Sequence, residues 1–491
     1  NLAHTKNIRI PNATSRHHIT RLLLQFSFLL FSFSSYTFML RRLFPIRQLY
    51  TTTRAMASKS TDPTSLHNPY FYQKPGQKDI WSLINETAAQ AQQESGEPIV
   101  NLGQGFFSYN PPEFAINAVE EALTKPQFNQ YAHARGNPNL LKQVAEHYSR
   151  SYGRAVGVDE VQITTGANEG MFAIFFGFLT PGDEVIVFEP FFDQYIPNVE
   201  MTGAKIKYVE IKYPKKFDNE VVTGQDWEID WEGLNNAITD KTKIIVINTP
   251  HNPIGKVFTE EELYKIGKLA VEHNLILVSD EVYENLYYTD KFPRPAALPQ
   301  LPELAERTLT VGSAGKSFAA TGWRVGYIQG PANLIKFVTA AHTRICFSTP
   351  APLQQAVSQG FEQAEKSNYF ENTRKEYEHK YKIFTKVFDD LGLPYTVAEG
   401  GYFVLVNLLK VKIPADYEFP GTISDRGTLD FKLAYWLIKE IGVVGIPPTE
   451  FLTESNRKGN GLENCVRFAV CKDDSVLEDA VERLKKLKDY L

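Results

Sequence analysis

The chain has 491 residues, of which 43% are hydrophobic and 22% are charged, a composition typical of soluble globular proteins with a large core. The formal net charge is −5 and no basic stripe runs through the body of the chain, so nucleic acid is excluded as an expected partner. The three cysteines, Cys346, Cys465 and Cys471, have a number and spacing that predict neither a disulfide framework nor a zinc site. We therefore expect a reducing compartment, or one in which disulfides play no part.

Residues 1–66 are predicted to lie outside the fold, as a targeting or disordered segment. The chain begins with Asn1, which we expect not to be the initiator. The stretch from Met39 to Met56 is rich in Arg and in hydroxyl side chains and contains no acid, which is typical of a mitochondrial transit peptide. A start at Met39 predicts a mitochondrial protein, and a start at Met56 predicts a cytosolic one.

Upstream of this stretch, residues 22–40 are uncharged and rich in Leu and Phe, and they are long enough to span a membrane. Several Ser, Thr and Gln side chains weaken that interpretation. In order of preference, the segment is non-coding sequence before Met39, a signal anchor or a transmembrane helix. For the folded body we expect no membrane association.

The body begins with helical spacing of apolar residues from Ile80, followed by a short strand near 99–102 and helices at 113–123 and 139–152. From Val161 onward, short apolar strands alternate with helices, which predicts a mostly parallel sheet covered on both faces. The seven predicted strands are 161–165, 184–188, 205–210, 243–248, 275–279, 308–311 and 326–329. In such sheets the ligand lies beyond the carboxyl ends of the strands.

The sequence after Gln354 changes in character. It is helical to about Leu391, continues as strands at 402–406 and 465–469, and closes with a helix at 475–490. This predicts an α/β fold in which a large domain is joined to a smaller α+β domain. We assign residues 67–107 to the N-terminal part of the small domain, 108–355 to the large ligand-binding domain and 356–491 to the rest of the small domain.

A lysine, Lys316, lies between Gly315 and Ser317 in a loop that follows a predicted strand. Small residues let a ligand approach the backbone closely. The same loop supplies a hydroxyl at Ser313 and a fixed cation at Arg324. The set suits pyridoxal 5′-phosphate (PLP), with Lys316 as a Schiff base on the aldehyde and the other two on the phosphate. The alternative, an exposed lysine in a flexible loop, is disfavoured by the motifs that follow.

Polar residues at other strand ends suit the ring of the same cofactor. Asp280 can pair with the pyridinium nitrogen and keep it protonated, or it can cap a helix. Tyr283 and Asn252 can reach the phenolate oxygen of the ring. Phe192 can stack on the ring face, or it can belong to the core.

Three further motifs complete the candidate site. Gly166 makes a turn before a helix, so the backbone N–H groups of Ala167 and Asn168 would point at a phosphate, unless the turn is a plain helix cap. Arg467, flanked by Val and Phe, would bind a substrate α-carboxylate or form a structural salt bridge. Trp81 would form an aromatic wall for an apolar substrate side chain, or simply pack.

In order and spacing, these residues resemble the fold type I PLP-dependent aminotransferases from about Asn68 to Leu491. The strings Leu102-Gly-Gln-Gly-Phe and Asp280-Glu-Val-Tyr look like the branch of kynurenine aminotransferase, glutamine transaminase K and cysteine-S-conjugate β-lyase. The resemblance implies that Lys316 is the acid/base of the proton shift. It also implies that Gly105 joins Asn252 and Arg467 in binding the substrate carboxylate.

The resemblance further implies a homodimer with shared active sites, in which Tyr131 reaches the phosphate of the neighbouring subunit and Phe347 contacts substrate. The implied reaction moves the amino group of L-kynurenine, and also of glutamine or aromatic amino acids, to a 2-oxo acid and yields kynurenate. A β-lyase side activity is implied as well. Ser348 stands where some animal members carry His, and this leaves the side-chain preference open.

Two rival functions remain open. One is another fold type I enzyme, such as an alanine or aspartate transaminase or a lyase like aminocyclopropane-carboxylate synthase. A lyase would differ from the transaminases in needing no amino acceptor. The other is a non-enzymatic binding protein on the same fold. The combination of Lys316, Asp280 and Arg467 argues against the binding protein.

Overall fold

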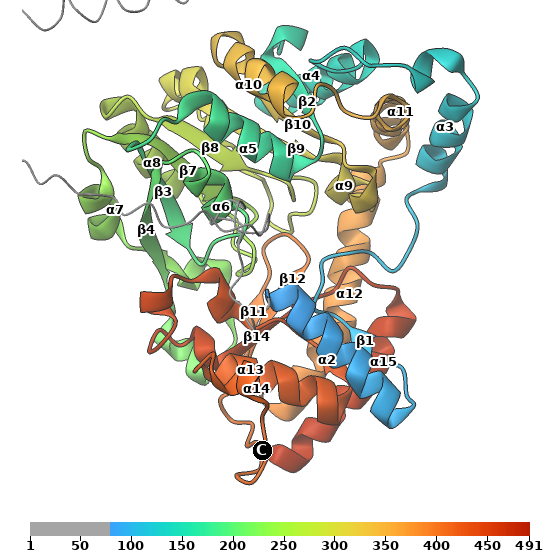
Figure 1. The fold of residues 1–491 in the computed structure, drawn as a ribbon, viewed down its shortest axis with the longest axis vertical. Helices are drawn as coiled ribbons and strands as arrows, with labels where there is room; N and C mark the ends of the chain where they lie inside the picture. Colours follow the sequence, from blue (N-terminus) through green and yellow to red (C-terminus); the bar gives the residue numbers. More distant parts are fainter. Residues whose placement is uncertain (1–78) are drawn as a thin grey trace, which may run out of the picture. The chain divides into compact units, whose positions relative to one another are not determined.

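Eight strands form the large sheet at the centre of the computed structural model, which describes residues 79–491 (Figure 1). Their order is β2 (Val161–Thr164), β10 (Gly326–Gln329), β9 (Thr308–Ser313), β8 (Ile276–Asp280), β7 (Thr242–Asn248), β3 (Glu184–Glu189), β4 (Lys205–Lys212) and β6 (Glu228–Ile229). Only β10 and β6 run antiparallel to their neighbours in this sheet. All seven predicted strands are present, and β6 adds an eighth that is too short to show an apolar pattern.

Helices cover both faces of this sheet, as predicted. Because side chains alternate along a strand, Val185 and Val187 of β3 pack with one set of helices, whereas Ile186 packs with the other. The first set comprises α5 (Ala167–Phe178), α6 (Tyr195–Glu200) and α10 (Ala332–Ile345). The second set comprises α7 (Trp231–Ala237) and α8 (Glu260–Glu272), whereas α4 (Pro138–Tyr152) and α11 (Ala351–Lys366) pack against β2 and β10.

The strand register brings the polar strand ends together. Asn248, the last residue of β7, pairs with Asp280, the last residue of β8. Ser313 ends β9, and β2 ends at Thr164 just before the turn at Gly166. Since β2, β7, β8 and β9 all run in one direction, these residues lie at one edge of the sheet, which is where a ligand is expected.

The lower part of Figure 1 holds the first described helix and the C-terminal elements. They share one hydrophobic cluster that joins Val100 and Leu102 to residues beyond 376, and a second that joins α2 to α14. The elements are α2 (Ile80–Ser95), β1 (Val100–Asn101), α12 (Tyr369–Leu391), β12 (Phe403–Asn407), α13 (Gly421–Ser424), α14 (Leu429–Trp436), β13 (Val443–Val444), β14 (Cys465–Ala469) and α15 (Asp474–Leu484). The remaining ones are α3 (Glu113–Leu123), α9 (Ala314–Ser317) and the paired β5 (Val222–Thr223) and β11 (Thr396–Val397).

Two predicted helices differ in detail from the structure. The helical stretch after residue 354 is divided between α11 and α12, because Asn368 adopts a left-handed conformation with φ of 51°. The last helix continues beyond Leu484 only as 3₁₀ turns. The domain boundaries remain predictions, and residues 1–66, with the transit peptide, the 22–40 segment and both candidate start sites, lie outside the described residues.

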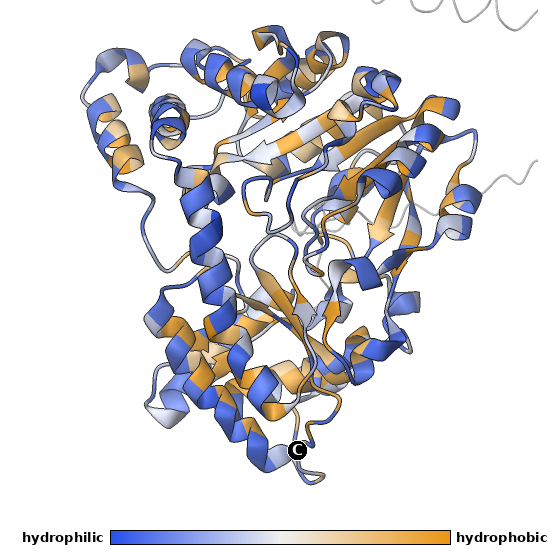
Figure 2. Ribbon diagram, turned by 180° about the vertical axis from the view of Figure 1, so that it is seen from behind, coloured by the Kyte–Doolittle hydropathy of each residue, from blue (hydrophilic) through white to orange (hydrophobic). Residues whose placement is uncertain are grey.

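Hydropathy follows these layers. In Figure 2 the strands of the sheet are largely apolar, whereas the outer helices carry polar residues along much of their length. Among the helices of residues 79–491, none combines the length and the apolar composition that crossing a bilayer requires.

Candidate active site

A cavity of about 190 Å³ lies at the carboxyl edge of the large sheet. It is lined by Ala167, Asn168, Met171, Phe192, Tyr195, Asn248, Asn252, Asp280, Val282, Tyr283, Ser313, Lys316, Thr321 and Arg324. The structure thus brings together most of the residues predicted to bind a cofactor, although they come from segments more than 150 residues apart in the sequence.

Lys316 points into this cavity from the short helix α9, which follows β9. Its Nζ donates a hydrogen bond of 2.6 Å to the hydroxyl of Tyr402 and lies 3.4 Å from the carbonyl oxygen of Gly105. Removal from water lowers the pKa of Lys316 to about 8. A lysine with a lowered pKa has a larger neutral fraction near pH 7, as a nucleophilic amine requires.

The start of α5 and Arg324 lie close together in the lining of the cavity. Gly166 has φ of 81°, and a Cβ at this position would lie 2.3 Å from Nη2 of Arg324, so only glycine allows this approach. Ala167 and Asn168 begin the helix, where backbone N–H groups are free to bind an anion. Ser313 lines the same cavity. The cation of Arg324, the start of α5 and the hydroxyl of Ser313 together match the donors that a phosphate requires.

Asp280 is buried and accepts hydrogen bonds from the hydroxyl of Tyr195 and from the backbone N–H of Val282. Burial raises the pKa of Asp280 to about 6. Asn248 holds the segment in place by donating 3.0 Å to the carbonyl oxygen of Asp280. A buried carboxylate of this kind gains from a cationic partner, such as a protonated ring nitrogen.

Arg467 enters the site from β14 and is 2% exposed. Its Nη1 donates 2.9 Å to Oδ1 of Asn252, and its Nη2 donates 2.9 Å to the carbonyl oxygen of Gly103. Desolvation lowers the pKa of Arg467 to about 10. Among residues 79–491 no carboxylate forms an ion pair with Arg467, and its Nε has no hydrogen-bond partner. The predicted alternative of a structural salt bridge is therefore not observed, and the guanidinium is available to an anion.

Two further predicted residues lie next to this arginine and Lys316. The ring of Trp81, in α2, lies 5.9 Å from Cζ of Arg467, and its Nε1 donates 3.2 Å to Asp193. Gly105 contributes its carbonyl oxygen, which accepts a 2.9 Å hydrogen bond from Tyr402. The indole of Trp81 therefore lies beside the guanidinium of Arg467.

Tyr131 and Phe347 do not line the cavity around Lys316. They are 88% and 52% exposed, and their rings meet edge to face with centroids 5.5 Å apart. Together with Ser348 they border a different cavity of about 580 Å³. Large exposed aromatic side chains in contact with each other are unusual on a monomer surface.

Two residues of the site escaped the prediction, namely Tyr195 and Tyr402. Tyr195 closes the string Glu189-Pro-Phe-Phe-Asp-Gln-Tyr, whose position after a strand was a usable signal. Tyr402 follows Gly400 and Gly401 at the start of a predicted strand, where an aromatic residue is expected to belong to the hydrophobic core. Its contact with Lys316 spans 86 positions, and no local pattern encodes it.

The cavity as a whole suits PLP. Its lining combines the cation of Arg324 and the backbone N–H groups at the start of α5 with the carboxylate of Asp280 and the amine of Lys316. These groups match a ligand with a phosphate, an aldehyde and a ring nitrogen. The aromatic ring of Phe192 lines the cavity beside Tyr195, where it can face a planar ring.

Comparison with known proteins agrees with this geometry. Residues 97–484 match the family model of aminotransferase class I and II. The probable kynurenine–oxoglutarate transaminase BNA3 of Saccharomyces cerevisiae is 54% identical over 433 residues, which cover 87% of this chain and 96% of the relative. The kynurenine–oxoglutarate transaminase of Dictyostelium discoideum is 37% identical, and the aligned region covers 79% of this chain and 91% of the relative.

Solved structures show the same likeness. The crystal structure of Bna3p from Saccharomyces cerevisiae superposes with a TM-score of 0.84. The matched region covers 87% of this chain and 99% of the Bna3p chain. An aspartate aminotransferase of Thermus thermophilus is 29% identical and superposes with a TM-score of 0.70. The matched region covers 84% of this chain and 97% of that enzyme. Enzymes of this class use PLP, for which the cavity around Lys316 is suited. The chain belongs to the class I and II aminotransferases, with the fold type I architecture of that family.

Proposed function

We propose that this aminotransferase takes L-kynurenine as amino donor and a 2-oxo acid as acceptor, with glutamine and aromatic amino acids as further donors. The observation that carries the proposal is the pairing of Arg467 with Trp81. The guanidinium is buried, forms no ion pair within residues 79–491 and lies next to an indole ring. An α-amino acid with an aromatic side chain offers a carboxylate and a ring for these two groups. The similarity to kynurenine–oxoglutarate transaminases supports the same substrate.

In this reaction PLP supplies the electron sink and carries the amino group between the two substrates. Arg467 and Asn252 hold the α-carboxylate, which fixes the α-carbon relative to Lys316. The Nζ of Lys316 would accept the α-proton of the bound amino acid and act as the acid/base of the proton shift. Asp280 would hold the ring nitrogen of the cofactor in its protonated form. The donor leaves as its 2-oxo acid, which for kynurenine closes to kynurenate, and the acceptor leaves as an amino acid.

A half-reaction tests the proposal. The purified holoenzyme receives L-kynurenine without any 2-oxo acid, and the absorbance of the cofactor is followed as it passes from its aldehyde to its amine form. We expect this change in the wild type and its loss in Lys316→Ala. A cofactor band that responds to alanine or aspartate but not to kynurenine would retain the mechanism and refute the substrate. Release of ammonia from a cysteine S-conjugate tests the β-lyase side activity.

We also propose a homodimer with shared active sites. The exposed pair of Tyr131 and Phe347 supports it, because a second copy of the chain would cover both rings. Mixing two inactive variants, Lys316→Ala and Tyr131→Ala, gives a sharp test. In a shared-site hybrid dimer, one site carries both changes and the other carries neither, so activity reappears. If each subunit used only its own Tyr131, the mixture would stay as inactive as its components.

For localisation, we propose that the start site decides the compartment, with Met39 leading to the mitochondrion and Met56 to the cytosol. The acid-free, Arg-rich composition between them supports this proposal. Fluorescent fusions at the C-terminus, made with either methionine as the first residue, test it. Mitochondrial signal from the fusion that begins at Met56 would contradict the proposal.

A further inference from the structure

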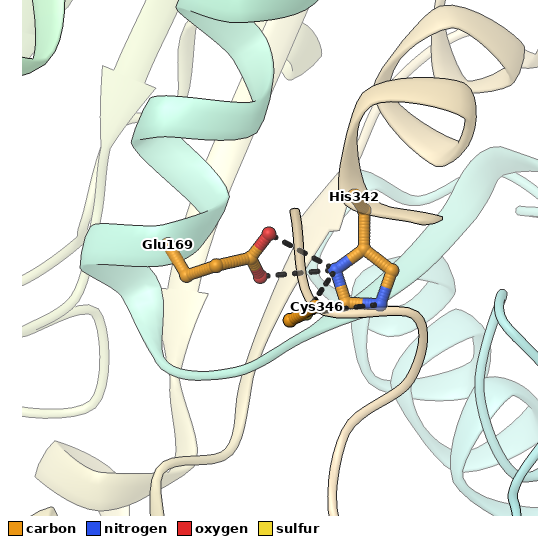
Figure 3. Close-up of side chains that lie close together, drawn as sticks. All are labelled: Glu169, His342 and Cys346. Atoms are coloured by element: carbon orange, nitrogen blue, oxygen red, sulfur yellow. Dashed lines mark hydrogen bonds and ion pairs between the residues drawn. The ribbon is translucent and has the colours of Figure 1, made fainter. Parts of the chain in front are cut away.

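A second group of chemically reactive side chains lies outside the cofactor cavity. It consists of Glu169, His342 and Cys346, which we call the EHC cluster (Figure 3). Glu169 comes from the first turn of α5, His342 from α10, and Cys346 directly follows α10 as its C-cap. None of the three lines the cavity around Lys316. The aminotransferase reaction derived above gives them no role.

The three side chains converge on one point. Nδ1 of His342 lies 3.0 Å from each carboxylate oxygen of Glu169, and Sγ of Cys346 lies 3.5 Å from the same Nδ1. Figure 3 shows all three pointing toward one another from two helices. Their ligand atoms lie within 4.8 Å of one another.

These separations match the edges of a metal coordination sphere. Zn²⁺ holds sulfur at ~2.3 Å and nitrogen or oxygen at ~2.0–2.2 Å, so ligands that share a tetrahedral ion lie roughly 3.2–3.7 Å apart. The contact between Sγ and Nδ1 is already in that range, and the contact between Nδ1 and the carboxylate needs only a small expansion. Thiolate, imidazole and carboxylate together favour Zn²⁺ over Mg²⁺ or Ca²⁺.

The charge balance favours a cation at the same point. The side chain of His342 is fully buried and that of Glu169 is 12% exposed. Within residues 79–491, neither lysine nor arginine forms an ion pair with Glu169. A divalent ion would supply the positive charge that a largely buried carboxylate and a thiolate need.

Surrounding groups hold the ligands in place and leave a path to the site. The backbone N–H of Thr165 donates 2.9 Å to Glu169, and the Thr165 hydroxyl lies 3.4 Å from Sγ of Cys346. Such partners orient metal ligands. Cys346 also borders the surface cavity of about 580 Å³, through which an ion can enter.

We propose that the EHC cluster is a binding site for one Zn²⁺ ion per chain, with Glu169, His342 and Cys346 as ligands and solvent in the fourth position. Binding displaces the thiol proton of Cys346 to solvent. The ion would join the first turn of α5 to the end of α10. The cysteine spacing did not predict such a site, because two of the three ligands are not cysteines. One of these two, Glu169, also lies on a different helix from the others.

The test uses the tag-free holoenzyme, stripped of metal and loaded with Co²⁺ as a spectroscopic substitute. We expect d–d absorption bands in the red, clear of the cofactor bands, with the intensity of a four-coordinate ion and a sulfur ligand. Equilibrium dialysis with Zn²⁺ should give one ion per chain. Zn²⁺ should also raise the melting temperature of the wild type, because it binds only the folded state.

Three variants sharpen the result. Cys346→Ser and His342→Gln should each weaken Zn²⁺ binding by more than the roughly 10- to 100-fold that loss of an outer-shell partner costs. His379→Gln is the matched control, because His379 lies 3.6 Å from Asp474 in a surface pair without a cysteine, and it should leave binding unchanged.

The proposal is overturned if the wild type shows no Co²⁺ bands, or if Cys346→Ser retains them. The first of these outcomes is read from the wild type, so it does not depend on whether a variant folds. Transaminase activity is not the readout, so failure of the proposed substrate would leave this test intact.

Discussion

The Nζ of Lys316 donates a hydrogen bond of 2.6 Å to the hydroxyl of Tyr402, and this hydroxyl in turn donates 2.9 Å to the carbonyl oxygen of Gly105. The phenol thus links the amine of Lys316 to the backbone at Gly105. A cation that donates to a buried oxygen is stabilised, so the contact opposes the desolvation that lowers the pKa of Lys316 to about 8. Tyr402 is therefore placed to orient the amine during proton transfer.

Replacing Tyr402 with Phe removes this contact and preserves the ring. We expect kcat to fall by about 10- to 100-fold, since a hydrogen bond to a charged group contributes about 1.5–3 kcal/mol. The pKa of Lys316 should also fall further, which moves the acidic limb of the pH profile of kcat to lower pH. Steady-state kinetics over a pH series measures both effects.

Tyr288→Phe is the control for this prediction. The hydroxyl of Tyr288 donates to the carbonyl oxygen of Gly401, next to Tyr402 in sequence, but it has no contact with Lys316. An equal loss of kcat in both variants, with no movement of the pH profile, would mean that Tyr402 acts only through packing.

The fold was predictable because its signals are local. The apolar runs of β7 and β8 and the glycine turns after β2 show where strands end, and parallel strands carry their ends to one edge. Lys316, Asp280 and Asn252 were found this way. The short strand β6 was not, because two residues carry no periodicity.

Contacts between distant segments could not be predicted from such signals. Tyr402 meets Lys316, and Glu169 meets His342, only because separate elements pack together. The same limit applies to Arg467, whose two interpretations differ only in whether an acidic residue lies nearby. In the structure, Arg467 contacts Asn252 and a carbonyl oxygen instead of a carboxylate, which supports the substrate-binding interpretation.

Asp280 gives a prediction for the cofactor-free protein. Because burial raises its pKa to about 6, the folded state binds this proton more tightly than the unfolded chain does. Asp280 therefore contributes roughly 3 kcal/mol to the free energy of unfolding below pH ~4. This contribution is lost as the pH rises to ~6. Urea unfolding of the wild type and of Asp280→Asn, from pH 4 to pH 7, measures the difference between the two proteins.

The comparison with Asp280→Asn isolates this group, since other buried acids such as Glu281 titrate in both proteins. The free energy of the wild type minus that of the variant should fall as pH rises across this window. A constant difference would show that Asp280 has an ordinary pKa. Binding of PLP should reduce the effect, because a protonated ring nitrogen stabilises the ionised carboxylate.

Arg467→Lys tests the carboxylate site. Lysine keeps the charge but loses the planar pair of donors that hold Asn252 and a carboxylate together. We expect KM to rise for both the amino donor and the 2-oxo acid, by roughly 30-fold or more, since breaking a buried charge-assisted contact costs about 2 kcal/mol or more. Arg483→Lys, in α15, should leave both values unchanged. A rise for only one of the two substrates would contradict a shared carboxylate site.

Trp81 should set the preference for aromatic donors. Its ring lies 5.9 Å from the guanidinium of Arg467, where the side chain of a bound amino acid would pass it. Replacing Trp81 with Ala should lower kcat/KM for kynurenine and phenylalanine by roughly 3- to 10-fold, since aromatic contacts contribute about 0.5–1.5 kcal/mol beyond area burial. The value for alanine should change little. Asp193→Asn, which keeps an acceptor for the indole N–H, serves as the control. An equal loss for alanine and kynurenine would show that Trp81 supports the fold of α2 rather than the choice of substrate.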